Sequence, residues 1–331
     1  MRKFIHTYND ITSLDNLLYA WEEFKKGKAK RKDVLEFQYS LMDNILSLHK
    51  DLENKTYTHG AYEAFNISDP KPRNIHKASV RDRLLHHTIY RKLYPFFDRK
   101  FISDSYSYRK EKGTHRAIDR FRVFTRKESK NNTKTVWVLK CDIKKFFASI
   151  DHEILKNILK EHISDSEVLR LLNKIIDSFH EAQKEKGLPL GNLTSQLLVN
   201  IYMNEFDQFV KQKLKAKYYI RYADDFVFLS QDKKYLEDLL LQVERFLEKE
   251  LKLILHPNKV SIETSSSGVD FLGWVHFPKH RVLRTVTKKR MFRNVIEKEG
   301  KKETVSSYLG MLCHGNGEKL RGEVLSKISN I

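Results

Sequence analysis

Apolar residues recur at three- and four-residue steps over residues 11–54, in stretches such as "ITSLDNLLYAWEEF" and "VLEFQYSLMDNILSLHKDLEN". This period predicts amphipathic helices. The segment "SDPKPRNIHKASVRDRLLHHTIYRKLYPFF" is predicted to open with a proline-bearing turn and to continue as a basic helix. Further helices are predicted from about Asp151, in "SEVLRLLNKIIDSFHEAQ", after the glycine turn of "KGLPLGNLTSQLLVNIYMNEFDQFVKQKL", in "KKYLEDLLLQVERFLEKEL" and over the basic residues 281–331.

Strand patterns alternate with these helices. "TVWVLKCDIKKFF" (135–147) is rich in β-branched and aromatic residues and predicts a buried strand ending near Asp142. Alternation in "YYIRY" and "FVFLS" predicts a hairpin with its tip at Ala223–Asp225, and "KLILHPNKVSIETSSSGVDFLGWVHF" predicts short strands. The alternation of strands and helices indicates an α+β or α/β sheet domain with helical flanks.

Two adjacent carboxylates, Asp224 and Asp225, lie at the tip of the predicted hairpin between apolar residues. Burying an unpaired charge costs several kcal/mol, so each carboxylate needs a partner. Strand alternation would turn the nearby Arg221 away from at least one of them. A solvated hairpin tip is the alternative, since Asp is common in turns, but the flanking Tyr222 and Phe226 make a wholly solvated turn less favourable.

A third carboxylate, Asp142, ends the predicted strand "VWVLKCD". Three carboxylates on two adjacent strands can hold a pair of Mg²⁺ ions, which prefer oxygen ligands. Two such ions about 3.5–4 Å apart stabilise the attacking and leaving oxygens of a phosphoryl transfer. The sequence spacing between Asp142 and Asp224 permits such a site without requiring it.

Charge narrows the range of partners. The formal net charge of +19 predicts a polyanionic partner, most often nucleic acid, although ribosomal or chromatin-type proteins would have the same property. Hydrophobic residues at 40% and charged residues at 32% are typical of a soluble globular protein. We expect no membrane span and no signal peptide, and two cysteines are too few for a disulfide framework. A cytoplasmic protein is therefore predicted.

Seven motifs in order resemble those of reverse transcriptases. "CDIKKFF", "LPLGNLTSQ", "YADD", "HPNKVSI" and "FLGWVHF" look like palm motifs, and "KPRNIHKASVRDRLLHH" and "DSYSYRKEKGTHRAI" resemble finger-region motifs of bacterial members. The resemblance covers roughly residues 65–280. It implies an α+β right-hand polymerase fold with an N-terminal helical extension of the fingers (1–60), fingers and palm around an antiparallel sheet (61–280), and a short helical thumb (281–331).

The resemblance implies RNA-directed DNA synthesis, in which a primer 3′-hydroxyl attacks the α-phosphate of a dNTP and pyrophosphate leaves. Asp142, Asp224 and Asp225 match the family's metal-binding triad, with the Ile143 carbonyl as an additional ligand. Two Mg²⁺ ions are the expected cofactors, with Mn²⁺ as a substitute. Lys259 resembles the family lysine that protonates departing pyrophosphate; a solvated loop lysine is the alternative.

The dNTP pocket is predicted from the same resemblance. Phe147 matches the aromatic gate against a ribose 2′-hydroxyl, with a core aromatic as the alternative, and Phe146 is the expected core residue. Lys71 and Arg73 are candidates for the triphosphate, because guanidinium groups bind phosphate bidentately.

Basic segments are candidates for contact with the template and primer. "HRAIDRFR" and "RVLRTVTKKRMFR" interleave basic and aromatic residues, which suits contact with a nucleic-acid backbone, although such runs are usually solvated faces. The candidate nucleic-acid contacts are Lys77, Arg81, Arg83, Arg116, Gly273 and Trp274.

The turn "LPLGNLTSQ" narrows the type of reverse transcriptase. Many members have glutamine before this glycine and proline after the serine, whereas this chain has Leu190 before Gly191 and Gln196 after Ser195. "GNLTSQ", "KGTHRA", "YLGMLCHGNG" and the N-terminal helices resemble the enzymes of diversity-generating retroelements. All four turn residues are assigned to the dNTP site. Leu190 offers only apolar contact near the nascent pair, which predicts errors opposite template adenine; alternatively, Leu190 packs under the turn.

The resemblance also implies partners. We expect a dedicated template RNA, a DNA or RNA primer, dNTPs and a small basic accessory protein, in the cytoplasm of a bacterium or a phage-infected bacterium. We expect no appended endonuclease or RNase H-like domain. One rival interpretation is an antiphage defence reverse transcriptase that copies its own noncoding RNA. Another is an RNA-binding protein with a dead polymerase core, which the intact set of three aspartates argues against.

Overall fold

The computed structural model describes residues 3–68, 72–181 and 183–329. The chain divides into two compact units, each built from three stretches of sequence. Unit 1 comprises Met1–Ile102, Ile143–Lys213 and Arg245–Ile254, and unit 2 comprises Ser103–Asp142, Leu214–Glu244 and Leu255–Ile331. The boundaries expected at residues 60 and 280 stay predictions.

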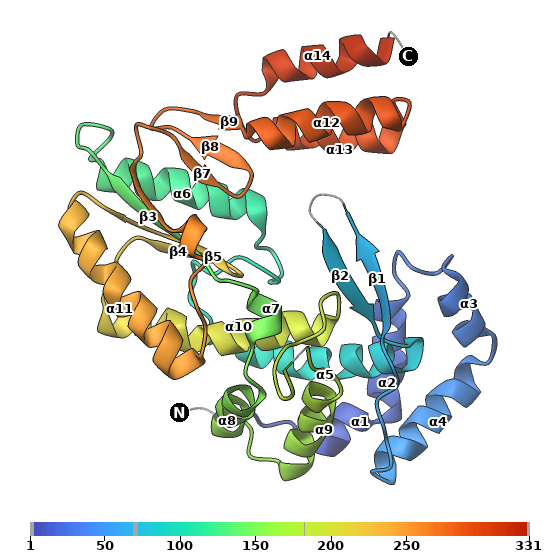
Figure 1. Cartoon of the computed structure of the whole chain (residues 1–331). Coiled ribbons are helices and arrows are strands. Elements are labelled where there is room, and N and C mark those ends of the chain that lie inside the picture. The colour runs from blue at the N-terminus through green and yellow to red at the C-terminus, as the bar shows by residue number, and fades with distance from the viewer. Residues whose placement is uncertain (1–2, 69–71, 182, 330–331) are drawn as a thin grey trace. The chain divides into compact units, whose positions relative to one another are not determined.

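Unit 1 is mainly helical (Figure 1). Helix α10 is buried on nearly all sides, including polar residues such as Asn200 and Asp207, and packs on α5, which in turn packs on α2. It is therefore the central helix of the unit 1 core. Helix α5 begins after Ser79, whose hydroxyl accepts a hydrogen bond from the Asp82 amide. The helices of unit 1 are α1 (Tyr8–Thr12), α2 (Leu14–Phe24), α3 (Lys32–Tyr39), α4 (Leu41–Glu53), α5 (Val80–Asp98), α7 (Phe146–Ser149), α8 (His152–His162), α9 (Ser166–Asp177) and α10 (Leu193–Gln208), with a π-helical turn at Phe209–Lys213.

A hairpin in unit 1 contains a strand that was not predicted from the sequence. The helix expected in the segment that follows is present as α5, but β2 (Arg73–Lys77) precedes it and pairs antiparallel with β1 (Glu63–Ile67). The proline-bearing turn expected at the start of the segment falls mainly on residues 69–71, outside the described residues. Strand β1 is exposed along its whole length, and no β2 residue is fully buried. Because neither face enters a core, the strands lack the alternation of apolar and polar residues by which a half-buried strand is recognised.

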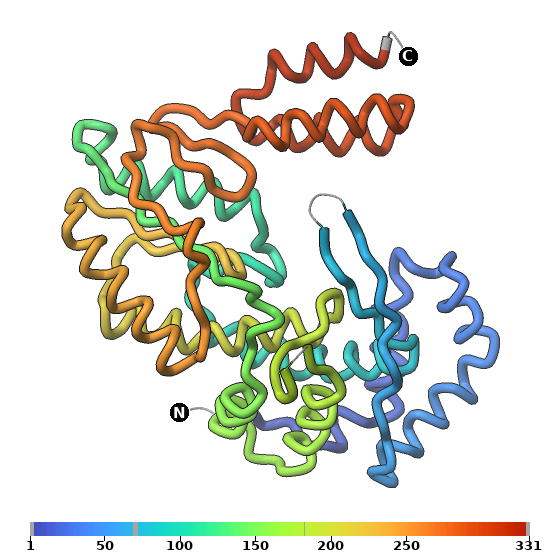
Figure 2. Tube along the Cα trace, in the orientation of Figure 1, coloured from blue at the N-terminus to red at the C-terminus, as the bar shows by residue number. Residues whose placement is uncertain are grey.

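Unit 2 is built on an antiparallel sheet with strand order β4-β5-β3-β6. The strands are β3 (Trp137–Asp142), β4 (Tyr219–Tyr222), β5 (Asp225–Ser230) and β6 (Ser261–Thr264). In the trace of Figure 2, β3 lies between strands that come much later in the chain. The predicted strand ending at Asp142 and the predicted hairpin around Ala223 are both confirmed.

Helix α6 (Thr114–Glu128) covers this sheet through Ile118, Phe121 and Phe124, which join one buried apolar cluster with Ile220 and Val227. The same cluster includes residues from a second sheet, with strand order β7-β8-β9, and from the C-terminal helices. These elements are β7 (Val269–Phe271), β8 (Trp274–His276), β9 (Arg281–Leu283), α12 (Thr285–Glu297), α13 (Lys302–Leu312) and α14 (Glu318–Ser329).

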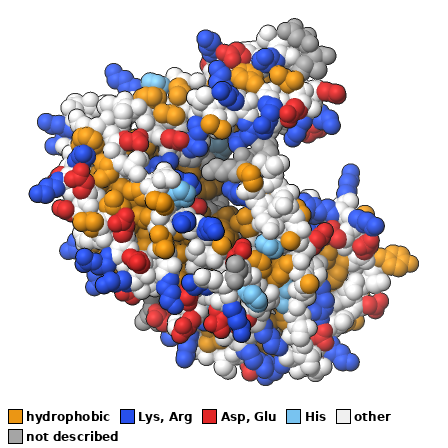
Figure 3. All heavy atoms as spheres, viewed as in Figure 1, with side chains coloured by type: hydrophobic (Ala, Val, Ile, Leu, Met, Phe, Trp, Pro, Cys, Tyr) orange, Lys and Arg blue, Asp and Glu red, His pale blue; other side chains and the backbone are white. Residues whose placement is uncertain are grey.

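Helix α11 (Lys233–Leu251) runs from unit 2 into unit 1, and a short 3-10 helix occupies Pro257–Lys259 in unit 2. Within the described residues, no helix is both long and apolar enough to cross a membrane. On the face shown in Figure 3, lysine and arginine side chains are spread widely over the surface, as the net charge of +19 leads one to expect.

Candidate active site

The three predicted carboxylates lie at one end of the central sheet of unit 2. Asp142 is the last residue of β3 and Asp225 the first of β5, and the two are direct partners in the antiparallel register. Asp224 precedes Asp225 in the turn that joins β4 to β5. Asp142 is only 7% exposed, and its two companions are half-buried. The sheet therefore brings together carboxylates that are far apart in sequence.

The hairpin tip that carries Asp224 and Asp225 is held by a buried arginine. Ala223 adopts φ +56°, a left-handed conformation that a residue with a side chain rarely takes. Arg221 is fully buried; its Nη1 donates to the Ala223 carbonyl (3.2 Å) and its Nη2 to Ser105 Oγ (3.1 Å). Such charge-assisted bonds hold a strained turn in place.

The backbone of Arg221 is also fixed. Its amide donates to the Asp104 carbonyl (3.0 Å), and its own carbonyl accepts from the Tyr106 amide (2.9 Å). Sequence reasoning noted Arg221 only as a charge near the two aspartates and missed this anchoring role. A lone arginine inside an otherwise apolar strand, immediately before a turn, was the available signal.

Lys259 contacts one of these carboxylates, Asp142, directly. Its Nζ donates to Asp142 Oδ1 at 2.9 Å, and the lysine side chain is 43% exposed. The backbone docks the same loop, because the His256 amide donates to the Asp142 carbonyl (2.7 Å) and the Lys259 amide donates to the His256 carbonyl (2.9 Å). The "HPNK" loop is thus attached to the end of β3.

The three carboxylates repel one another. Burial, followed by the negative charges of Asp224 and Asp142, raises the pKa of Asp225 to about 7. A hydrogen bond with the Asp142 side chain contributes in the same direction, and Lys140 opposes the shift. A divalent cation bound here would relieve this repulsion.

The donor set fits Mg²⁺ in chemical type, because carboxylate oxygens are the ligands this ion prefers. Its arrangement is not yet a closed ligand cage: within the described ranges, no three His, Cys, Asp or Glu side chains converge closely enough to hold a metal ion. Asp142 is instead bonded to Lys259. Ile143, the predicted carbonyl ligand, follows Asp142 directly and is buried.

Among the residues predicted to bind the dNTP, those that the structure describes belong to unit 1. The Leu190 carbonyl accepts a hydrogen bond from the His76 amide of β2 (3.1 Å), and Asn192 Nδ2 donates to the His76 carbonyl (2.8 Å). The Phe147 carbonyl accepts from the Leu188 amide (2.9 Å). The "LPLGN" turn is therefore bonded on one side to the β1–β2 hairpin, which bears Arg73, and on the other to α7.

Glycine is required at one position of this turn. Gly191 has φ +106°, and a Cβ added there would lie 2.9 Å from Ile75 Cγ2 on β2. Among the neighbouring candidates, Ser195 is buried and Gln196 half-buried. Phe146 is buried, as expected for the core aromatic, and Phe147 is half-buried.

The basic finger residues are engaged within unit 1. Lys77 and Arg83 both pair with Asp33 of α3, and Arg81 pairs with Asp51 of α4. These pairs join the hairpin and α5 to the N-terminal helices. Arg73 is exposed, whereas Lys71 lies outside the described residues.

The remaining nucleic-acid candidates are in unit 2. Arg116 is exposed on α6. Leu272 and Gly273 form the β7–β8 turn with positive φ at both residues, as a type I′ hairpin turn requires. Trp274 is 2% exposed, so its indole is a core group, and Gly273 is the more exposed of the two candidates in this hairpin.

These residues lie within a region that matches a known protein family. Residues 67–276 match the family described as reverse transcriptase (RNA-dependent DNA polymerase). Protein YkfC of Escherichia coli (strain K12) is 28% identical over 255 residues, covering 66% of this chain and 65% of YkfC. The group II intron-encoded protein LtrA of Lactococcus lactis subsp. cremoris is 24% identical over 319 residues, covering 75% of this chain and 51% of LtrA. The chain thus spans less than two thirds of either relative.

Solved structures show the same fold. Apo telomerase from Candida tropicalis superposes with a TM-score of 0.51 at 13% identity, over 73% of this chain and 60% of that chain. Telomerase from Candida albicans, in complex with a fragment of telomeric RNA, superposes with a TM-score of 0.50 at 11% identity, over 75% and 51% of the two chains. The predicted right-hand polymerase fold class, with mixed helices and antiparallel sheets, is confirmed.

Proposed function

Because this chain belongs to the reverse transcriptase (RNA-dependent DNA polymerase) family, we propose that it is an RNA-directed DNA polymerase that extends a primer along an RNA template. The observation that carries the proposal is the pairing of Asp142 with Asp225 across β3 and β5, beside Asp224 on an anchored tip. A surface that only bound RNA would have no need for three adjacent, mutually repelling carboxylates.

Asp142, Asp224 and Asp225 would hold the Mg²⁺ ions, and bound ions supply charge stabilisation for nucleotidyl transfer. Arg221 would keep the two tip carboxylates in position. Lys259, bonded to Asp142, would deliver a proton to the departing pyrophosphate.

Residues of unit 1 would receive the incoming nucleotide. Arg73 and Lys71 would bind the triphosphate, and Phe147 would exclude the 2′-hydroxyl of a ribonucleotide. The turn containing Leu190 and Gly191 would lie against the nascent base pair. Its two bonds to β2, which bears Arg73, support a shared role for the turn and the hairpin.

Primer extension on an RNA template with Mg²⁺ and dNTPs tests this proposal. Asp225→Asn should reduce extension by at least about 1,000-fold, because the removed carboxylate would hold the Mg²⁺ ions that stabilise charge on the reacting phosphate, while RNA affinity stays close to that of the wild type. Glu263→Gln, at an exposed carboxylate on β6 of the same sheet, is the matched control. Equal activity of Asp225→Asn and the wild type would contradict the assignment.

The finer assignment is to the diversity-generating retroelement type, with a dedicated template RNA, a small basic accessory protein and errors at template adenines. Its support is the sequence resemblance of "GNLTSQ", "KGTHRA" and "YLGMLCHGNG". The latter two motifs also meet in space, because His115 stacks on His314 with ring centroids 3.5 Å apart. The error spectrum of the cDNA distinguishes this type from a defence enzyme that copies its own noncoding RNA.

A further inference from the structure

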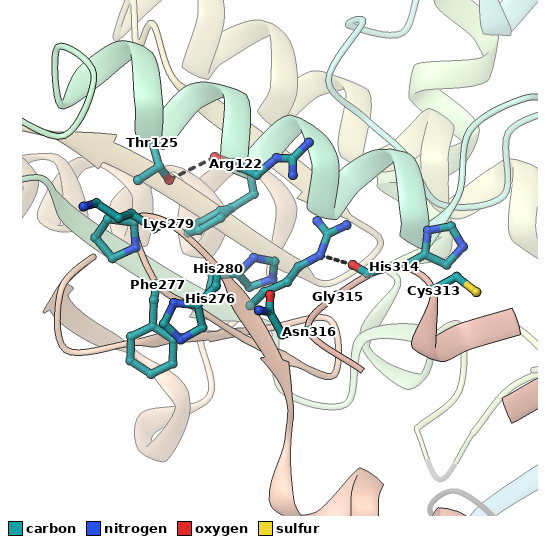
Figure 4. A pocket seen from close by; sticks show the side chains of 13 residues that line it. Arg122, Thr125, His276, Phe277, Lys279, His280, Cys313, His314, Gly315 and Asn316 are labelled. Carbon is teal, nitrogen blue, oxygen red and sulfur yellow. Dashed lines mark hydrogen bonds between the residues drawn. The ribbon is translucent and has the colours of Figure 1, made fainter. Parts of the chain in front are cut away.

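A second candidate site in unit 2 is a cavity of about 220 Å³ at the junction of three segments. Helix α6 contributes Arg122, the β8–β9 turn contributes Lys279 and His280, and the α13–α14 turn contributes His314 (Figure 4). Arg281, at the start of β9, also lines the cavity. Among the lining residues that the structure describes, none is an aspartate or glutamate. The lining therefore favours an anion.

Arg281, which lines this cavity, has a buried donor without a partner among the described residues. It is 8% exposed; its Nε donates to the His314 carbonyl and its Nη2 to Asp119 Oδ1 (2.8 Å). Its Nη1 is buried and has no hydrogen-bond partner. Leaving a buried donor of a charged group unpaired is unfavourable, and an anion that accepted a hydrogen bond from it would offset this cost.

The cavity wall is held firmly by contacts that explain the "CHGNG" sequence. The backbone of Gly315 lies so close to Trp274 that an added Cβ would be 2.1 Å from the ring. The rings of His115 and His314 stack at 14°. These contacts fix the α13–α14 turn against α6 and β8, so the cavity is built by packed residues.

We propose that this cavity seats one backbone phosphate of the RNA bound by the enzyme, with donors from Arg281, Arg122 and Lys279. The inference rests on the proposed function. Sites for whole small molecules usually measure about 300–1,000 Å³, so a cavity of about 220 Å³ suits a phosphate and its adjoining atoms better than a complete nucleotide.

Two features favour a polymer as the source of the phosphate. Arg122 and Lys279 are exposed at the rim, where a strand can reach them. Arg281 also begins the basic run "RVLRTVTKKRMFR", and the chain carries a net charge of +19. Several weak phosphate contacts along one strand would together give strong binding.

The test measures the affinity of the full chain for an RNA template annealed to a DNA primer, over a series of KCl concentrations. The double variant Arg122→Gln/Lys279→Gln should lower the slope of log Kd against log [KCl] by about 1, as expected for the loss of one phosphate contact. The control is Arg126→Gln/Lys319→Gln, which removes two exposed charges that do not line the cavity. An equal loss of slope in the control would overturn the proposal.

Single neutral methylphosphonate linkages, placed at each RNA position in turn, test for one seated phosphate. The wild type should lose about tenfold in affinity at one linkage or two adjacent ones, whereas the double variant should be insensitive there. Equal losses in both proteins at every linkage would mean diffuse attraction and would overturn the proposal. A second outcome would also overturn the proposal: millimolar inorganic phosphate raises the Tm of the wild type but not that of the double variant, while the two proteins have equal salt slopes. The cavity would then bind free anions and no RNA phosphate.

Primer extension with saturating template–primer separates failure of this inference from failure of the proposed function. The double variant should extend at the wild-type rate once the template is saturating. A wild type that extends, paired with a double variant of unchanged salt slope, overturns the phosphate seat alone. A wild type that neither binds nor extends overturns both.

Discussion

Arg221 Nη1 donates a hydrogen bond to the carbonyl of Ala223 at 3.2 Å, across the tip that carries Asp224 and Asp225. The arginine is fully buried, and its Nη2 bonds to Ser105 Oγ, 116 residues earlier in the chain. The guanidinium therefore joins the hairpin tip to a distant segment of unit 2. This contact gives the tip a defined position despite the left-handed conformation of Ala223.

Arg221→Met should weaken this anchoring. Loss of the two side-chain bonds is expected to destabilise unit 2 by about 2–4 kcal/mol and to raise the Mg²⁺ concentration for half-maximal primer extension several-fold. Arg221→Lys keeps the charge but loses the two-pronged guanidinium, so it should give an intermediate effect. Urea unfolding and a Mg²⁺ titration measure the two quantities. An unchanged Mg²⁺ requirement in a destabilised Arg221→Met protein would show that the arginine is only structural.

Variants of Lys259 distinguish a chemical role for this lysine from a purely structural ion pair. The side chain is 43% exposed, so its pair with Asp142 contributes at most about 1 kcal/mol to stability. If Lys259 protonates pyrophosphate, Lys259→Met should slow single-turnover extension about 100-fold, and Lys259→Arg should not restore the rate because arginine holds its proton too strongly. Full activity in both variants would mean that Lys259 pairs with Asp142 without a role in proton transfer.

Leu190→Gln tests the assignment of the enzyme type. Glutamine would add an amide able to hydrogen-bond near the nascent pair, so errors opposite template adenine should fall several-fold. Sequencing of cDNA made by the two proteins on one RNA template measures the change. Leu193→Gln, three residues away at the start of α10, is the control. An unchanged error spectrum in Leu190→Gln would mean that Leu190 packs under the turn without influencing base selection.

Acid should destabilise unit 2 through His276. Burial lowers the pKa of His276 to about 4, although its bond to the Phe271 carbonyl opposes the shift; Arg281 also lowers this pKa, and Asp270 and Asp119 raise it. Because the unfolded chain binds the proton at an ordinary pKa near 6.5 and the folded chain does not, stability is full above about pH 6.5 and falls as pH drops toward 4.

The histidine is 3% exposed, so the effect should be measurable. Between pH 7.5 and pH 5, His276 should account for a loss of about 2 kcal/mol in the free energy of unfolding. Over the same pH range, the free energy of unfolding of His276→Gln should fall by about 2 kcal/mol less than that of the wild type. The free energy of unfolding of His280→Gln, a variant at an exposed histidine, should fall by the same amount as that of the wild type. Urea unfolding at the two pH values gives the difference, and identical pH dependence in all three proteins would contradict it.

Local sequence was enough to predict the elements that carry the candidate site. The strand ending at Asp142 and the hairpin around Ala223 follow from alternation and turn residues, which act over a few neighbouring positions. The β1–β2 hairpin was not predictable in this way, because both of its strands lack a buried face. Its formation depends on partners outside the segment, such as Asp33, which pairs with Lys77.

Sequence by itself determined which residue types stand at the strand ends, and hence the family and the kind of chemistry available. Only the tertiary structure decided how those residues are held: Lys259 bonds to Asp142 across 117 residues, Arg221 bonds to Ser105 across 116, and Arg281 bonds to Asp119 across 162. Periodicity carries no information about such pairs, because it reports only which face of an element is buried. The partners that meet on that face are chosen by the packing of the whole unit.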